Sequence, residues 1–123
     1  MITDKGKSLI ADYIVSTFVK GDVGSGGNTT NPAQTDLDVP LLTTLETITP
    51  KKSDENVVDF KMTIQGSTAT ISGRSLRECG IFDASNNMLA RFNFDAIGPF
   101  SSSEEVEFFI AIEVEWYDNN QLH

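Results

Sequence analysis

The feature that most constrains the fold is a run near the C-terminus in which every second residue is apolar. The run extends from Val106 to Trp116, and its six apolar side chains share one face. This period of two is typical of a β-strand with one buried face. Burying the six side chains contributes roughly 10 kcal/mol of gross transfer free energy, most of which conformational entropy offsets. We therefore expect this strand to lie centrally in a sheet.

The first third of the chain predicts a helix followed by a loop. Apolar residues at helical spacing predict an amphipathic helix over residues 3–20, in which Leu9, Tyr13 and Phe18 cover part of the β-structure. We expect Gly21 to end this helix, and the Gly-, Asn- and Thr-rich residues 21–35 to form a flexible loop.

The rest of the chain predicts a β-rich core over residues 57–117. We expect a strand at 57–65 that turns at Gly66-Ser67 into a return strand at 68–72, a hairpin of 76–83 with 88–94, and a short strand within 36–49. The predicted fold class is mostly β: an antiparallel β-sandwich of about six or seven strands with one N-terminal helix, in a single domain of residues 1–123.

Charge and composition exclude several classes of partner. The net charge is -9, and the few basic residues are scattered, so we expect no nucleic acid partner. No apolar run approaches the ~18 residues of a membrane helix, and the N-terminus lacks the basic leader of a signal peptide. We expect a protein made in the cytoplasm without export, with no membrane partner. The single cysteine, Cys79, excludes an internal disulfide.

Residues suited to catalysis or metal binding are sparse. The sole histidine is the terminal His123, and Cys79 has no histidine near it in sequence to generate a thiolate. Glu113 and Glu115 share the outer face of their strand, and such carboxylate pairs are usually solvated and not catalytic. The aspartates around the loop lack the spacing of an established calcium site. The sequence therefore predicts no enzyme, no catalytic residue, no metal and no cofactor.

Some residues are instead candidates for structural or assembly contacts. Glu78 stands in an apolar strand and needs a counterion if it is buried. Arg74, Arg77 and Arg91 are available, and a pair with Arg91 on the neighbouring hairpin strand would fix the register. Phe109 and Tyr117 lie on the otherwise polar face of the last strand, which indicates that this face is not wholly exposed and meets either a second subunit or the helix. A loop of such length is typical of contact regions. Its candidate contacts are Asn28, Thr29, Thr30 and Asp36.

Two segments resemble a family of small virion structural proteins of tailed, phage-like viruses, related to tail-fibre N-terminal, baseplate-attachment or decoration domains. An "ITxxGxxLI" helix precedes a PAQTDLxxPL-like segment, here Pro32 to Leu42. A later "REaGLFDasgnLLAR" hairpin is matched by Arg77, Glu78, Gly80, Ile81, Phe82 and Asp83, and then by Leu89, Ala90 and Arg91. The resemblance implies a virion component that assembles as a homo-oligomer, with a trimer favoured, and that binds other virion proteins.

The resemblance leaves the position in the virion open. The chain ends at His123 without a fibre shaft, so we expect two alternatives. The protein attaches to tail, baseplate or fibre components, or it decorates the head as a capsid or turret protein. A further alternative is a carbohydrate-binding module for host recognition, with Tyr13, Trp116 and Tyr117 as stacking candidates. A small hydrolase that uses a carboxylate pair is the least favoured alternative.

Overall fold

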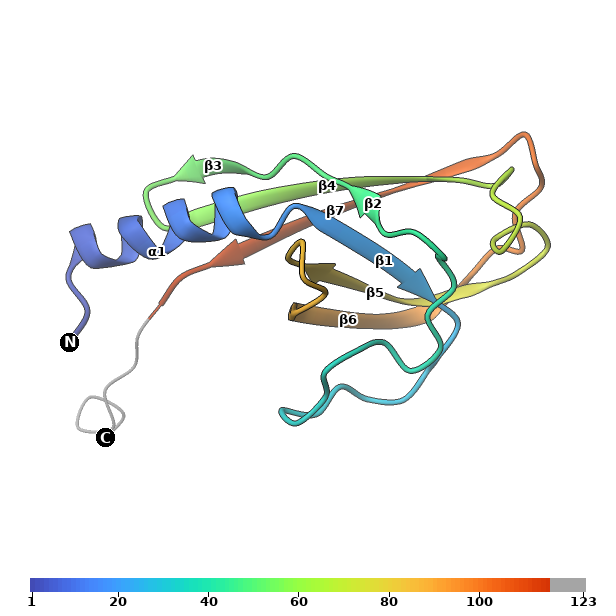
Figure 1. Cartoon of the computed structure of the whole chain (residues 1–123), viewed down its shortest axis with the longest axis horizontal. Coiled ribbons are helices and arrows are strands. Elements are labelled where there is room, and N and C mark those ends of the chain that lie inside the picture. Colours follow the sequence, from blue (N-terminus) through green and yellow to red (C-terminus); the bar gives the residue numbers. More distant parts are fainter. Residues whose placement is uncertain (116–123) are drawn as a thin grey trace.

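The computed structural model describes residues 1–115, which form one helix and two antiparallel sheets (Figure 1). The four-stranded sheet has the order β2-β1-β5-β6, and the three-stranded sheet has the order β3-β4-β7. The predicted fold class, an antiparallel sandwich with an N-terminal helix, is confirmed. The elements are α1 (Asp4–Thr17), β1 (Lys20–Gly24), β2 (Glu46–Thr47), β3 (Lys51–Asp54), β4 (Val57–Gln65), β5 (Leu76–Phe82), β6 (Met88–Ile97) and β7 (Glu105–Glu113).

Helix α1 begins where the sequence predicts but buries a different face. The Thr3 side chain caps it by accepting a hydrogen bond from the backbone N–H of Gly6. Its buried residues are Ser8, Ala11 and Ile14. Leu9 and Tyr13, which we expected to cover the β-structure, are 53% and 61% exposed. The small Ser8 and Ala11 allow the helix to lie close to the sheet, and this close approach decides its rotation.

Strand β1 occupies part of the segment that the sequence predicts as a flexible loop, so the loop prediction for residues 21–24 is wrong. The helix ends at Thr17, and Gly21 lies within β1 instead of capping the helix. A β-carbon at Gly21 would collide with the Sδ of Met62 in the opposite sheet. Here glycine permits two sheets to pack closely. Composition alone does not show whether a glycine serves close packing or flexibility.

The strand after β4 is also predicted wrongly. Residues 68–72 form turns, in which Ile71 and Ser72 donate backbone hydrogen bonds to the carbonyl oxygen of Thr68. Strand β4 pairs instead with β3 and, over its whole length, with the distant β7. Ile71 is fully buried, so this segment contributes to the core through side-chain packing and not through strand pairing.

The second predicted hairpin is confirmed as β5 and β6, which pair in antiparallel register. Asp83 shapes the turn between them, because its carboxylate accepts hydrogen bonds from the backbone N–H groups of Ser85 and Asn87. The side chain of Asn87 donates a further hydrogen bond to Asp83, and Asn86 adopts the left-handed φ of 66°. The predicted short strand within 36–49 corresponds to β2.

Strand β7 lies at an edge of the three-stranded sheet, so its predicted central position is wrong. Alternation shows that one face is apolar, but it does not reveal how many neighbours the strand has. The core is centred on β4, whose Val58, Phe60 and Met62 are almost completely buried. Inner side chains of β7 are only half-buried, and Phe108 packs on Phe94 of β6 with ring centroids 5.5 Å apart.

The two sides of the sandwich therefore differ. On one side the chain crosses from β2 to β3, and the buried Ile48 and Pro50 close the space between the sheets. On the other side β6 faces β7. Among the described residues, ten of the thirteen half-buried apolar side chains that pack on the core belong to β6, β7 and the residues next to them. The β6/β7 side is thus the more open one.

Candidate functional site

The candidate site is an ion pair buried on the outer face of the four-stranded sheet. Glu78 of β5 and Arg91 of β6 lie on adjacent strands. Arg91 pairs in register with Gly80, two residues along β5 from Glu78, so Glu78 and Arg91 are diagonal neighbours. The Arg91 Nε donates to Glu78 Oε1 at 2.9 Å, and both side chains are 0% exposed. The structure thus brings together the two residues that the sequence suggests as an ion pair.

The remaining acceptor capacity of Glu78 is used by the loop between β1 and β2. Its Oε1 also accepts from the backbone N–H of Asp38 at 2.8 Å. Its Oε2 accepts from the N–H groups of Gly26 and Val39, at 2.8 and 2.9 Å. Residues on both arms of the loop therefore converge on a single carboxylate.

Two opposing effects set the pKa of Glu78. Burial raises it, because the charged carboxylate loses its hydration. The hydrogen bonds to the carboxylate lower it, and together they outweigh burial, so the pKa lies below the ordinary value. The donors are Val39, Arg91, Asp38 and Gly26. The site is consequently built for an ionised Glu78.

Arg91 holds the same loop through its other nitrogens. Its Nη1 donates to the carbonyl oxygen of Asn28 and to the Oγ1 of Thr30, both at 2.7 Å. Its Nη2 lies 3.3 Å from the Oδ2 of Asp38 and 3.4 Å from the carbonyl oxygen of Gly26. The loop is therefore fastened to the sheet at several points, in contrast to the predicted flexible connector.

Glycines make room for this arrangement. A β-carbon at Gly24 would lie 2.5 Å from Glu78 Oε2, and one at Gly26 would lie 2.6 Å from the same atom. Both positions would also press on the other arm of the loop, at Val39 and Asp38. These glycines are required for the backbone to approach the carboxylate, which explains part of the glycine-rich composition.

A second buried carboxylate lies beside the pair. Asp22 of β1 is 2% exposed, and its Oδ1 accepts from the N–H groups of Val23 and Leu42. Burial raises its pKa to about 6, more than these hydrogen bonds lower it, and the nearby charges of Asp36 and Glu78 raise it further. No ion pair joins Asp22 to a cation within residues 1–115.

All of the predicted loop contacts are exposed, and two of them are also anchored. Asn28, Thr29 and Thr30 are exposed, and Asn28 and Thr30 also accept hydrogen bonds from Arg91. Asp36 is exposed, and its carboxylate accepts from the N–H of Leu37, which is buried. The solvent-exposed surface of the loop is therefore its outer side.

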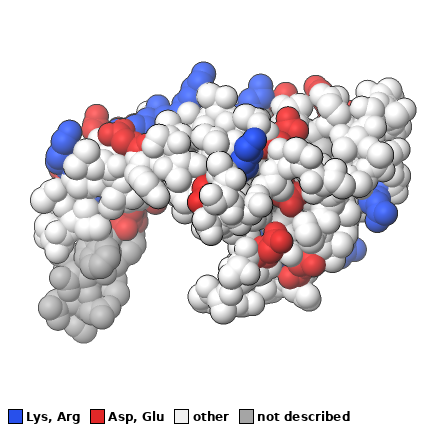
Figure 2. Space-filling model, in the orientation of Figure 1, with Lys and Arg blue, Asp and Glu red and all other residues white. Residues whose placement is uncertain are grey.

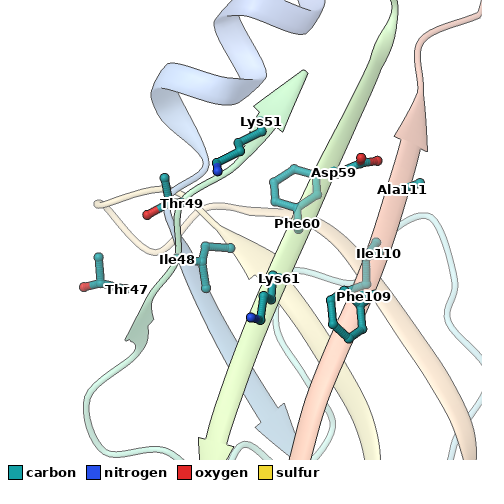
Figure 3. Close-up of a pocket in the computed structure, with 10 residues that line it drawn as sticks. All are labelled: Thr47, Ile48, Thr49, Lys51, Asp59, Phe60, Lys61, Phe109, Ile110 and Ala111. Atoms are coloured by element: carbon teal, nitrogen blue, oxygen red, sulfur yellow. The ribbon is translucent and has the colours of Figure 1, made fainter. Parts of the chain in front are cut away.

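Phe109 lies far from the loop in the fold, on the outer face of the three-stranded sheet. It is 72% exposed, and the Lys61 ammonium lies 5.9 Å from its ring centroid. It borders a shallow hollow of about 640 Å³ between β4, β7 and the chain at Thr47 to Thr49 (Figure 3). Tyr117, the other aromatic residue predicted on this face, lies outside the described residues, as do Trp116 and His123.

The described residues show little that is suited to metal binding or to thiol chemistry. No group of three or more histidine, cysteine or acidic side chains within residues 1–115 is placed to hold a metal ion. Burial raises the pKa of the Cys79 thiol to about 12, and the charge of Glu78 raises it further. Within the same residues, no helix is long and apolar enough to span a membrane.

Comparison with known proteins gives no relative. The chain has no significant match among protein-family models, curated proteins or solved structures.

Sequence reasoning identified the ion pair but missed the residues that complete it. Asp38 contributes both a backbone N–H to Glu78 and a carboxylate to Arg91, whereas the sequence places it only among the aspartates around the loop that lack the spacing of a calcium site. The glycine-rich composition predicts flexibility at Gly24 and Gly26 and not their close approach to a carboxylate. The available signal was the coincidence of a glycine-rich loop with one buried carboxylate, because backbone N–H groups can approach an anion closely where β-carbons are missing.

Proposed function

We propose that this protein is a non-enzymatic structural component of a tailed-virus particle, which assembles as a homo-oligomer and attaches to tail, baseplate or fibre components. One observation carries the proposal. Two of the three motifs behind the family resemblance, Pro32 to Leu42 and the β5–β6 hairpin, meet at the ion pair of Glu78 and Arg91. Residues of one motif bind residues of the other in the fold. This mutual dependence supports the view that the resemblance reflects a shared architecture.

The ion pair suits a presentation role better than a catalytic one. Both of its side chains are wholly buried, and their polar atoms are occupied by the loop. A buried ion pair contributes little net stability but can specify one conformation. A loop held in one conformation loses less entropy on binding, so its exposed outer side is a suitable docking surface for another virion protein.

The surface charge is consistent with protein partners. Basic and acidic side chains are interspersed on the face shown in Figure 2, without a continuous basic patch over the helix or the sheet. Nucleic acid binding depends on such a patch to neutralise phosphates.

The oligomer proposal is tested at Phe109. Lysine at this position adds a charge to the exposed outer face of the three-stranded sheet, so Phe109→Lys is expected to lower the oligomeric mass measured by light scattering after size-exclusion chromatography. Tyr13→Lys, at an exposed aromatic residue of α1, is the matched control and should leave the mass unchanged. An unchanged mass for Phe109→Lys would refute an interface at this face.

The virion role is tested on purified particles. We expect cryo-electron microscopy to place the domain at the tail, baseplate or fibre attachment region. Density on the head shell would support the decoration alternative instead, and absence of the protein from purified particles would refute the structural role.

A further inference from the structure

Strand β7 offers an unusually regular free edge. It pairs only with β4, over nine consecutive residue pairs without a register shift. The other edge strands of the described fold are shorter or irregular. Strand β2 has two residues, β3 has four and a register shift, and the pairing of β6 with β5 shifts at two places. In an antiparallel strand, alternate residues direct their N–H and C=O groups away from the existing partner. Within residues 1–115 no strand pairs with the outer edge of β7, so this edge carries a row of N–H and C=O groups without a strand partner in the described part of the chain.

Strand β7 itself lacks three of the devices that usually block strand addition, namely proline, lysine and a bulge. Proteins protect exposed edges with proline, lysine, bulges or a covering segment. The sequence of β7, EVEFFIAIE, contains neither proline nor lysine, and its pairing shows no bulge. The inner side chains Val106, Phe108 and Ile110 are only half-buried. An added strand would complete the hydrogen bonding and also cover this apolar row.

Charge indicates which strand fits. The outer face of β7 carries the exposed Glu105, Glu107 and Glu113. Lys61 lies 3.7 Å from Glu107, but Glu113 has no ion-pair partner among the described residues. A second β7 added antiparallel about Phe109 would place Glu105 opposite Glu113, and like charges directly opposite are unfavourable. The edge is thus better suited to a basic strand than to its own copy.

We propose that the β7 edge binds an extended segment of a different protein, in which apolar residues alternate with lysine or arginine. The segment adds a fourth strand to the three-stranded sheet, places its apolar side chains over the half-buried row, and directs its cations toward the outer glutamates. The inference rests on the proposed function, because it names the chemistry of a partner in the particle. It does not depend on self-association through Phe109.

The test uses the full chain and the synthetic peptide KVKIKVKIK. Isothermal calorimetry should detect binding of this peptide and not of its acidic counterpart EVEIEVEIE. A third peptide carries the basic sequence with every internal backbone nitrogen methylated, which preserves charge and side chains but removes the N–H donors from both strand edges. We expect it to bind at least about tenfold more weakly. Equal binding of the methylated peptide would refute strand addition, because charge alone would then explain the affinity.

A pair of variants locates the site. Glu105→Lys combined with Glu113→Lys should weaken binding of the basic peptide by about tenfold or more, since two opposite-charge pairs become repulsive. The control combines Glu46→Lys with Glu55→Lys, two exposed glutamates outside β7, and changes the net charge equally. Hydrogen exchange should slow in β7 when the basic peptide binds. The proposal would be overturned if hydrogen exchange slows in β6 alone, or if both double variants weaken peptide binding equally. It would also be overturned if self-association protects β7 from exchange without peptide.

The outcomes separate this inference from the proposed function. A virion protein that oligomerises through Phe109 but does not bind the basic peptide retains its structural role and loses the β7 site. Peptide binding by a protein that is absent from particles supports the β7 site and refutes the virion role.

Discussion

Replacing Glu78 by glutamine is expected to destabilise the protein by about 3–5 kcal/mol, although the two side chains have nearly the same shape. Each carboxylate oxygen accepts two hydrogen bonds, Oε1 from Asp38 N and Arg91 Nε, and Oε2 from Gly26 N and Val39 N. A glutamine amide must turn its NH₂ group toward one of these donor pairs. In either orientation two buried donors lose their acceptor, at a cost of about 1–3 kcal/mol each, and the buried arginine loses its counterion.

The measurement is urea unfolding at pH 7, combined with hydrogen exchange in the loop of residues 25–39. Because small domains have unfolding free energies of about 5–15 kcal/mol, the expected loss is a large fraction of the total. The control Glu46→Gln removes one charge at an exposed position of β2 and should change stability by less than about 0.5 kcal/mol. The reasoning is refuted if Glu78→Gln stays within about 1 kcal/mol of wild type and exchange in the loop is unchanged.

Other predictions concern groups around the same site. Asp22 in the folded protein keeps its proton up to about pH 6, whereas the unfolded carboxyl loses it near pH 3.8, so the unfolding free energy falls as pH rises through this window. The fall is up to roughly 3 kcal/mol, and Asp22→Asn should remove it in urea titrations from pH 4 to 7; a variant with the wild-type pH profile would contradict this. Gly26→Ala should lower the melting temperature by several degrees because its β-carbon meets Glu78, whereas Gly27→Ala meets only the flexible Arg77 side chain and should have little effect. Equal melting temperatures would count against the glycine requirement. Cys79 is 1% exposed with a raised pKa, so iodoacetamide should modify it at pH 8 only after unfolding, and rapid labelling of the native protein would disprove its burial.

Local patterns predicted the elements whose chemistry is local. Thr3 caps α1 through a hydrogen bond three residues away, and the Asp83 turn is made by neighbours in sequence. The β5–β6 hairpin follows from the same short-range information. The ion pair of Glu78 and Arg91 was also accessible, because a charged residue in an apolar strand needs a counterion and the adjacent hairpin strand offers one.

Long-range packing decided the features that the sequence alone misassigned. A glycine at position 21 is typical of the end of a helix. Gly21 instead lies in β1, where Met62 of the opposite sheet packs against it. The loop after β1 has the composition of a flexible linker, yet a carboxylate and a guanidinium some forty to sixty residues away bind its backbone. Such partners cannot be read from a local pattern.

By itself, the sequence determined the fold class and the strand period, since both follow from the spacing of apolar residues, and it offered Arg91 as a counterion if Glu78 is buried. The tertiary structure decided that β7 lies at an edge and that Glu78 organises the loop. Alternation specifies which face of β7 is apolar, but the number of its neighbours depends on where β3 and β4 pair. The role of Glu78 likewise depends on backbone donors that only the folded chain brings within hydrogen-bonding distance.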